Sequence, residues 1–354
     1  MIRHEQYIQR CLQIAKNGIG TTRPNPSVGA VIVCKGVIVG EGFTAAYGGN
    51  HAEVNAVNSV EHKKLLVEST LYVTLEPCSH FGKTPPCADL IIKYNIKRVV
   101  IGCVDTNSLV AGQGIERLKS AGVVVTVGVL EAECRKHHKR FFVVQEKKRP
   151  YIILKWAETK DGFVAPLSKD AVAPKFISNR YSQQLVHKLR SQEHAILVGK
   201  NTVLEDNPKL NVRSWSGNNP IRVVLDSALG IPESAHVFDG SITTIVITGK
   251  IHGHEEVKTK KYAFNKNLIF EPIDFSKNVA EQICVVLLKH QVQSLIVEGG
   301  TQTLATFISE NLWDEALVFV GDHSFDAGVK APRLDKNYKK EHVLEDLIKK
   351  YTND

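Results

Sequence analysis

Apolar residues in the first 147 positions alternate between helical spacing and short β-rich runs. Ile8, Cys11, Leu12 and Ala15 recur at helical intervals and predict a helix over residues 4–18. Residues 28–33 and 37–43 read as a hairpin that turns at Lys35-Gly36. The pattern then predicts helices over residues 52–60, 87–94, 114–121 and 131–146, and strands over residues 71–75, 98–104 and 123–129. Strands that alternate with helices predict an α/β sandwich.

The same alternation restarts after the cluster Lys147-Lys148-Arg149-Pro150, where a helix-breaking proline follows three charges. A chain of 354 residues exceeds one ordinary core, so we expect two domains, residues 1–147 and 148–354. The second half predicts strands over residues 151–156, 195–199, 221–226, 244–248, 268–271, 294–297 and 316–320, with helices over residues 178–191, 279–290 and 303–312. Ser178 is the predicted N-cap of its helix. The tail, residues 341–354, fits either a terminal helix or an edge strand.

Composition narrows the class of protein. A hydrophobic content of 43% and a charged content of 23% are ordinary for a globular chain. The sequence contains no run of about 18 apolar residues that would predict a membrane span, so we expect no membrane partner. The N-terminus lacks an apolar signal core, so we expect a cytoplasmic protein. Seven scattered cysteines argue against a secreted disulfide framework. The net charge of +8 suits anionic partners such as phosphorylated small molecules or a dinucleotide. Nucleic acid is not expected, because aromatic residues are not interleaved with the basic clusters.

The candidate chemistry lies in two short motifs. His51-Ala52-Glu53 opens one predicted helix, and Glu76-Pro77-Cys78 is followed by a second cysteine, Cys87. One imidazole and two thiolates suit zinc and leave a fourth tetrahedral position for water, as in catalytic sites. This order of residues is typical of zinc deaminases, in which a glutamate that does not bind the metal moves protons. We therefore predict His51, Cys78 and Cys87 as metal ligands and Glu53 as the catalytic residue that carries a proton from zinc-bound water to the ring nitrogen and the departing amine.

Each of these residues taken alone also has a purely structural explanation. His51 alone would be a helix-capping core residue, and either cysteine alone would be a small buried hydrophobe. Their joint occurrence in the correct order favours the metal site. His80 is a rival ligand two residues after Cys78, but it is better explained as a pocket residue or as a group that supports the ligands. The long segment between Cys78 and Cys87, instead of two residues, predicts a specialised pocket wall.

Together with the residues around them, these motifs resemble the bifunctional riboflavin-biosynthesis deaminase/reductases. The resemblance covers nearly the whole chain, and the interval from Cys78 to Cys87 is its most specific part. It rests on residues 23–26, 28–33, 40–42, 51–56, 72–80, 82–87, 110–114, 154–157, 161–162, 195–199, 223–227 and 297–300.

This resemblance implies a cytidine-deaminase-like α/β/α N-terminal domain and a dihydrofolate-reductase-like α/β C-terminal domain. It implies that zinc-dependent deamination of 2,5-diamino-6-ribosylamino-4(3H)-pyrimidinone 5′-phosphate releases ammonia. The second domain would then use NADPH to reduce the ribose to a ribityl chain. A homo-oligomer is the expected assembly.

The resemblance also implies roles for individual residues. Cofactor contacts fall on Ala157, Thr202, Asp206, Ser227, Gly300 and Thr301, within a loop that extends to Thr306. Substrate contacts in the reductase half fall on Arg190, Leu210, Arg213 and Glu298, and looser deaminase pocket candidates are Asn25, Lys83 and Asp105. Physical chemistry supports part of this set, because Gly299-Gly300 lets backbone N–H groups approach phosphate at a helix start and two arginines suit a phosphate.

Several positions depart from the family pattern. Thr44 replaces a usual His, Asn50 a Pro, Pro174 a substrate-contacting Ser and Phe176 a Trp, and Asp105-Thr106-Asn107-Ser108 replaces Asp-Pro-Asn-Pro. Two other hypotheses stay open, the first because it shares the metal site and the basic pI, and the second because of Pro174 and Phe176. One is a tRNA or nucleoside deaminase with an accessory domain, and the other is a nucleotide-sensing protein whose reductase half is inactive.

Overall fold

The computed structural model describes residues 4–81, 85–106, 111–167, 172, 175–249 and 265–353. The chain divides into two compact units, Met1–Lys148 and Arg149–Asp354. Each unit has its own hydrophobic core, and none of the buried residues in the described ranges belongs to the cores of both. The two units are therefore described separately.

The N-terminal unit is built on a five-stranded sheet in the order β2-β1-β3-β4-β5. Its strands are β1 (Gly29–Cys34), β2 (Val37–Phe43), β3 (Ser69–Leu75), β4 (Arg98–Cys103) and β5 (Val124–Val127). The predicted hairpin is confirmed, since β1 and β2 pair antiparallel and both Lys35 and Gly36 adopt positive φ in the turn. From β3 onward the pairing is parallel. The carboxyl ends of β3 and β4 consequently open on the same edge, where parallel sheets place ligands.

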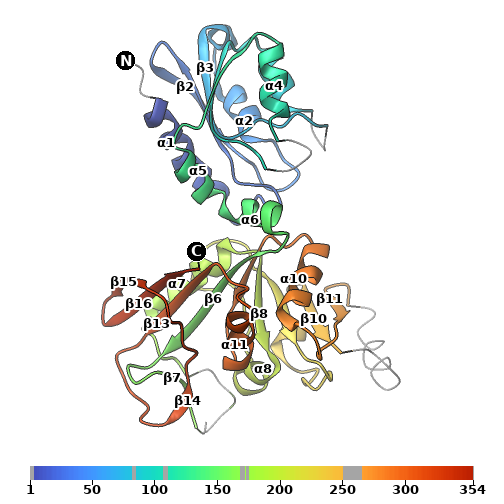
Figure 1. Ribbon diagram of the computed structural model, residues 1–354, viewed down its shortest axis with the longest axis vertical. Coiled ribbons are helices and arrows are strands. Elements are labelled where there is room, and N and C mark those ends of the chain that lie inside the picture. The colour runs from blue at the N-terminus through green and yellow to red at the C-terminus, as the bar shows by residue number, and fades with distance from the viewer. Residues whose placement is uncertain are drawn as a thin grey trace. The chain divides into compact units, whose positions relative to one another are not determined.

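Helices pack on both faces of this sheet (Figure 1). They are α1 (His4–Ala15), α2 (Ala52–Ser59), α3 (Cys87–Lys93), α4 (Gln113–Ser120), α5 (Glu131–His137) and α6 (Lys139–Lys147). On one face Gly29 allows α1 to approach, because a Cβ there would lie 2.0 Å from the carbonyl oxygen of Cys11. On the other face Gly42 allows α2 to approach, because a Cβ there would lie 2.3 Å from the amide nitrogen of Ala56. The α/β sandwich is thus confirmed, although the helix predicted over residues 131–146 divides at His138 into two.

The C-terminal unit contains a nine-stranded sheet in the order β11-β10-β9-β8-β12-β6-β13-β16-β15. Its strands are β6 (Tyr151–Glu158), β8 (Ala195–Gly199), β9 (Ile221–Leu225), β10 (Thr244–Thr248), β11 (Leu268–Pro272), β12 (Ser294–Val297), β13 (Glu315–Val320), β15 (Tyr338–Val343) and β16 (Asp346–Thr352). The strands from β11 to β13 are mutually parallel. The tail forms the antiparallel edge hairpin β15-β16, which decides between the two readings of residues 341–354.

Four helices of this unit are α7 (Arg180–Gln192), α8 (Lys200–Asp206), α10 (Val279–Lys289) and α11 (Thr301–Ser309). The sequence pattern missed α8, which is only seven residues long, and the small sheet of β7 (Phe163–Pro166) with β14 (Gly328–Lys330). The prediction that Ser178 caps α7 is wrong. Asn179 is the N-cap, and its side-chain oxygen accepts hydrogen bonds from the N–H groups of Tyr181 and Ser182.

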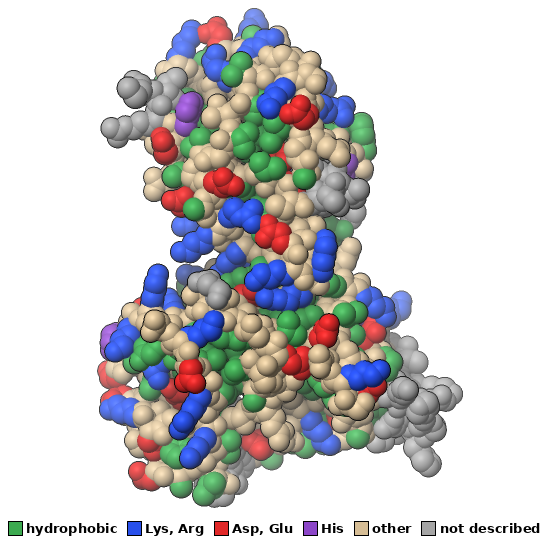
Figure 2. All heavy atoms as spheres, in the orientation of Figure 1, with side chains coloured by type: hydrophobic (Ala, Val, Ile, Leu, Met, Phe, Trp, Pro, Cys, Tyr) green, Lys and Arg blue, Asp and Glu red, His purple; other side chains and the backbone are tan. Residues whose placement is uncertain are grey.

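No helix in the described part of the chain is long and apolar enough to cross a bilayer. On the face drawn in Figure 2, Lys and Arg side chains are interspersed with Asp and Glu over each unit. The positive net charge is therefore not gathered into one stripe on that face.

Candidate active sites

Three side chains predicted as metal ligands lie together in the N-terminal unit. His51 Nδ1 is 3.5 Å from Cys78 Sγ and 3.3 Å from Cys87 Sγ, and all three donor atoms lie within 4.8 Å of one another. Zinc bonds of about 2.0 Å to nitrogen and about 2.3 Å to sulfur would separate tetrahedral N and S ligands by about 3.6 Å. The two nitrogen–sulfur separations thus match those of ligands that share one zinc ion.

Three different segments deliver these ligands to the carboxyl edge of the sheet. His51 precedes α2 in extended conformation, and its side chain makes no capping hydrogen bond there. Cys78 follows β3, and Cys87 is the first residue of α3, as predicted. The N–H of Cys87 donates to Cys78 Sγ at 3.3 Å, and the N–H of Ala88 donates to the carbonyl of Cys78 at 3.1 Å. The backbone therefore holds the two sulfur atoms side by side.

Hydrogen bonds within the cluster shift the pKa of all three ligand side chains. Hydrogen bonding to the Cys87 thiol, reinforced by His51, lowers the pKa of Cys78 to about 4, while the same pairing raises the pKa of Cys87. The hydrogen bond to Cys78 also raises the pKa of His51. A divalent cation at this position would hold both sulfurs as thiolates. The donor set fits zinc.

Glu53 lies in the first turn of α2 and is only 4% exposed. Burial raises the pKa of its carboxyl group to about 7, and the nearby Cys78 sulfur acts in the same direction. A carboxyl group that titrates near neutral pH can both accept and return a proton, as general acid–base catalysis requires. Glu53 is not one of the three clustered ligands.

A fifth residue of this site is Glu76, which opens the motif Glu76-Pro77-Cys78 and whose role the motif alone does not predict. Its buried carboxylate accepts four backbone hydrogen bonds: Oε1 from Gly114 and Ile115, at 2.9 and 3.2 Å, and Oε2 from Gly112 and Asp105, at 3.0 and 3.2 Å. Glu76 therefore ties the segment that carries Cys78 to the end of β4 and the start of α4. A glutamate two residues before a ligand was the only signal of this role in the sequence.

The remaining deaminase candidates are less closely placed. Asp105 is buried directly after β4 on the ligand edge, whereas Asn25 lies in the loop before β1. Lys83 lies outside the described residues. His80 is exposed and is not part of the ligand cluster. Thr44, where the family usually has His, bonds the start of β1 instead, since its Oγ1 accepts from the N–H of Val28 at 3.0 Å.

In the C-terminal unit, a pocket of about 930 Å³ opens at the carboxyl ends of β6, β12, β8 and β9. A pocket of this size suits a cofactor together with a small substrate. All ten reductase residues predicted from the resemblance line it: Ala157, Thr202, Asp206, Ser227, Gly300, Thr301, Arg190, Leu210, Arg213 and Glu298. They come from separate segments that the sheet order brings to one edge.

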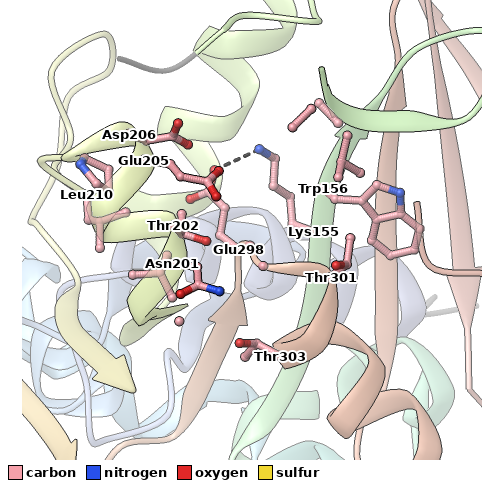
Figure 3. A pocket seen from close by; sticks show the side chains of 18 of the residues that line it. Lys155, Trp156, Asn201, Thr202, Glu205, Asp206, Leu210, Glu298, Thr301 and Thr303 are labelled. Atoms are coloured by element: carbon pink, nitrogen blue, oxygen red, sulfur yellow. Dashed lines mark hydrogen bonds and ion pairs between the residues drawn. The ribbon is translucent and has the colours of Figure 1, made fainter. Parts of the chain in front are cut away.

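Glu298 is the charged centre of this pocket (Figure 3). Its Oε1 accepts from Lys155 Nζ at 2.8 Å, and its Oε2 accepts from Arg190 Nη2 at 2.7 Å and Nε at 3.1 Å. Burial alone would raise the pKa of Glu298, but the charges of Arg190 and Lys155 outweigh it and hold the pKa at about 2. The ion pair also fixes Lys155 facing the pocket, a role that the residue pattern did not predict.

Arginines and a neutral histidine form the adjoining wall. His187 Nδ1 accepts a hydrogen bond from the N–H of Arg213 at 3.3 Å. Burial and the charges of Arg190 and Arg213 lower the pKa of His187 to about 4. The imidazole is therefore neutral near pH 7. Arg190, expected to meet the substrate phosphate, is paired with Glu298 here. The guanidinium of the exposed Arg213 donates to Oδ1 of the neighbouring Asn211 at 3.3 Å.

Two glycines open the phosphate end of the pocket. Gly299 and Gly300 adopt φ of +140° and +70°, which side-chain-bearing residues rarely adopt, and they lead into α11. Cβ atoms at either position would lie 3.4 Å from Thr202 Oγ1. The bare backbone N–H groups at a helix start suit a pyrophosphate, so the pocket fits NADPH. Phe176 lines the pocket and is exposed, whereas Pro174 lies outside the described residues.

The fold and sites define a class, a deaminase with a zinc site joined to a reductase. Comparison with protein families agrees. Residues 1–103 match the cytidine and deoxycytidylate deaminase zinc-binding region, and residues 150–322 match the RibD C-terminal domain.

Whole-chain relatives give the particular family. The chain is 40% identical to the riboflavin biosynthesis protein RibD of Aquifex aeolicus, over 97% of each chain. It is 34% identical to RibD of Escherichia coli, over 89% of this chain and 87% of that one. A crystal structure of the diaminohydroxyphosphoribosylaminopyrimidine deaminase/5-amino-6-(5-phosphoribosylamino)uracil reductase of Thermotoga maritima superposes with a TM-score of 0.85 at 35% identity, covering 98% and 97%.

The chain belongs to the RibD family of bifunctional deaminase/reductases of riboflavin biosynthesis. The predicted fold class, enzyme class and cofactors, zinc and NADPH, are confirmed at this level.

Proposed function

We propose that the N-terminal unit removes the ring amine of 2,5-diamino-6-ribosylamino-4(3H)-pyrimidinone 5′-phosphate by hydrolysis. The C-terminal unit would then reduce the ribose of the product to a ribityl chain. We assign the two activities to residues 1–147 and 148–354. The substrate follows from the enzyme names of the relatives, such as the Thermotoga maritima protein.

One observation carries the deaminase assignment: the His51, Cys78 and Cys87 donor atoms stand at zinc-compatible separations with a buried carboxyl group nearby. When bound, zinc supplies Lewis acidity and a water molecule whose pKa is lowered to about 7. Glu53 would take one proton of that water and give it to the ring nitrogen while the hydroxide adds to the ring carbon. It would then pass the second proton, from the hydroxyl group now on that carbon, to the departing amine. The two protons of one water thus end on the ring nitrogen and in the ammonia released, and Glu53 is regenerated.

For the reductase, NADPH supplies the hydride, and the pocket residues orient the two reactants. Thr202, Asp206 and Ser227, with Gly300, Thr301 and Ala157, would contact the cofactor. Glu298, Arg190, Arg213 and Leu210 would contact the substrate. The ion pairs of Glu298 with Lys155 and Arg190 keep one carboxylate and two cations rigid beside the reacting sugar.

The test is the variant Glu53→Gln, which keeps the size of the side chain and removes its acid–base chemistry. We expect ammonia release to fall by roughly 100-fold or more, the typical contribution of general acid–base catalysis. Zinc content, measured by atomic emission, should stay at one ion per chain, and NADPH oxidation with deaminated substrate should be unchanged. Full ammonia release by this variant would show that Glu53 is not the proton carrier.

The proposal also covers partners. We infer a phosphorylated pyrimidine as the small-molecule partner, a homo-oligomeric assembly, no nucleic-acid or membrane partner, and a cytoplasmic protein. Interspersed charges on the face drawn in Figure 2 support the absence of a nucleic-acid surface there.

A further inference from the structure

The adenosine end of the reductase pocket can be located from the sheet order. The pocket follows four neighbouring parallel strands, β6, β12, β8 and β9, each about 4.8 Å from the next. The Lys155–Glu298 pair lies at the β6 and β12 end, and Gly299-Gly300 follows β12. A dinucleotide whose nicotinamide lies at the Lys155–Glu298 pair and whose pyrophosphate lies at Gly299-Gly300 would extend its adenosine toward β9 and Ser227.

At that end, the carboxylate that could select NADH is turned away from the pocket. Dinucleotide enzymes that use NAD place an acidic residue near the ribose 2′-hydroxyl, while those that use NADP place a cation there. Asp226 directly follows β9 but is 1% exposed. Its Oδ1 and Oδ2 accept the N–H groups of Gly230 and Ile231, at 2.9 and 2.8 Å. Both oxygens are thus engaged by the protein backbone.

A cation does reach this end of the pocket. Lys200, the first residue of α8, is half-buried and lines the pocket together with Ser227. Its ammonium lies over Gly230, where a Cβ would stand 2.3 Å from Nζ and 3.0 Å from Cε. Glycine at position 230 therefore makes room for the lysine. Among the described residues, Lys200 has no ion-pair or hydrogen-bond partner for its ammonium.

We propose that Lys200, seated over Gly230 and beside Ser227, binds the 2′-phosphate of the cofactor's adenosine and makes the reductase select NADPH over NADH. The Lys200 ammonium, which has no partner among the described residues, can donate a charge-assisted hydrogen bond to a phosphate dianion. The neighbouring Ser227 hydroxyl can donate a neutral one. The inference rests on this pocket being the reductase cofactor site. It assigns cofactor specificity to Lys200, which is not among the residues proposed above to contact the cofactor.

The test compares the binding of NADP⁺ and NAD⁺ by calorimetry, without substrate, in the full-length protein and in Lys200→Met. We expect the Kd for NADP⁺ to rise roughly ten- to hundredfold, the range for a lost charged hydrogen bond, and the Kd for NAD⁺ to change less than about twofold. Gly230→Ala displaces the ammonium without removing it, so an intermediate loss of NADP⁺ affinity is expected.

Lys188→Met is the matched control. Lys188 is exposed on α7, outside the pocket lining, so its loss removes the same charge from the same unit and should leave both Kd values within about twofold. Equal weakening of NADP⁺ and NAD⁺ in Lys200→Met, or no weakening of either, would overturn the role of Lys200. Wild-type protein that bound neither dinucleotide would instead contradict the reductase site itself.

Discussion

At the scale of single residues, buried charged groups that act through the backbone position the deaminase site. Glu76 is the clearest case, because one carboxylate satisfies four N–H groups from residues 105 to 115. Gly114 is required beside it, since a Cβ there would stand 2.0 Å from the carbonyl oxygen of Pro77. The segment bearing Cys78 and the start of α4 are therefore locked together through Glu76.

We predict that Glu76→Gln lowers the free energy of unfolding by about 1–3 kcal/mol, because the amide group replaces an acceptor with a donor facing N–H groups. Ammonia release should fall while NADP⁺ affinity stays unchanged. Glu116→Gln on α4 is the control, since Glu116 is exposed and pairs only with Lys119 in the same helix. It should cost no more than about 0.5 kcal/mol. Urea unfolding and ammonia assays of the two variants test this prediction. Equal unfolding free energies and equal ammonia release in the two variants would contradict the role of Glu76.

At the scale of elements, α7 places Arg190 and His187 on the reductase pocket, and its start is fixed by Asn179. The side chain of Asn179 caps the helix and also donates to the carbonyl of Val343 at 2.8 Å, while its N–H donates to Asp346 at 2.8 Å. The N-terminus of α7 is thus bound to the edge hairpin β15-β16. The sequence pattern predicted Ser178 as the cap, whereas the contact with a hairpin more than 160 residues away places Asn179 there.

We expect Asn179→Ala to destabilise the C-terminal unit by about 1–2 kcal/mol through loss of the cap. Ser178→Ala is the neighbouring control and should change stability by less than about 0.5 kcal/mol. Tryptophan fluorescence in urea measures this unit selectively, because Trp156, Trp215 and Trp313 all lie within it. A larger effect of Ser178→Ala than of Asn179→Ala would contradict the assigned cap.

At the scale of the whole molecule, two separate cores carry two separate sites. The first core lies entirely within residues 7–142, and the others lie within residues 152–351. A ligand that stabilises one unit by mass action has no shared core through which to stabilise the other. Zinc should therefore support only the N-terminal unit.

Stripping zinc with a chelator is expected to speed hydrogen exchange in β3 and β4, which flank the ligand loops, and to leave β8 and β12 unchanged. The binding free energy of zinc is folding free energy for the unit that holds it, so its loss should show as lost protection there. Mass spectrometry of peptic peptides gives the readout. NADP⁺, added to the zinc-free protein, should protect β8 and β12 alone, and protection that spreads to β3 would show that the units are coupled.

The sequence by itself determined the α/β class, most element positions and the zinc ligands. Periodicity is a local property, and His51, Cys78 and Cys87 carry their chemistry in motifs that need no neighbours to be recognised. The reductase residues came through resemblance, since an isolated Glu298 or Arg190 has no local signal.

Only the tertiary structure decided which charges are paired and which are free. Glu76 accepts four backbone hydrogen bonds, and Asp226 accepts the N–H groups of its own loop. The Lys200 ammonium has no hydrogen-bond or ion-pair partner among the described residues. All three side chains are charged, so the sequence alone does not distinguish them. The short helix α8 and the edge hairpin β15-β16 likewise depend on neighbours, since neither has a strong pattern of its own. Burial and hydrogen bonding are set by segments distant along the chain, and local residue patterns therefore cannot encode them.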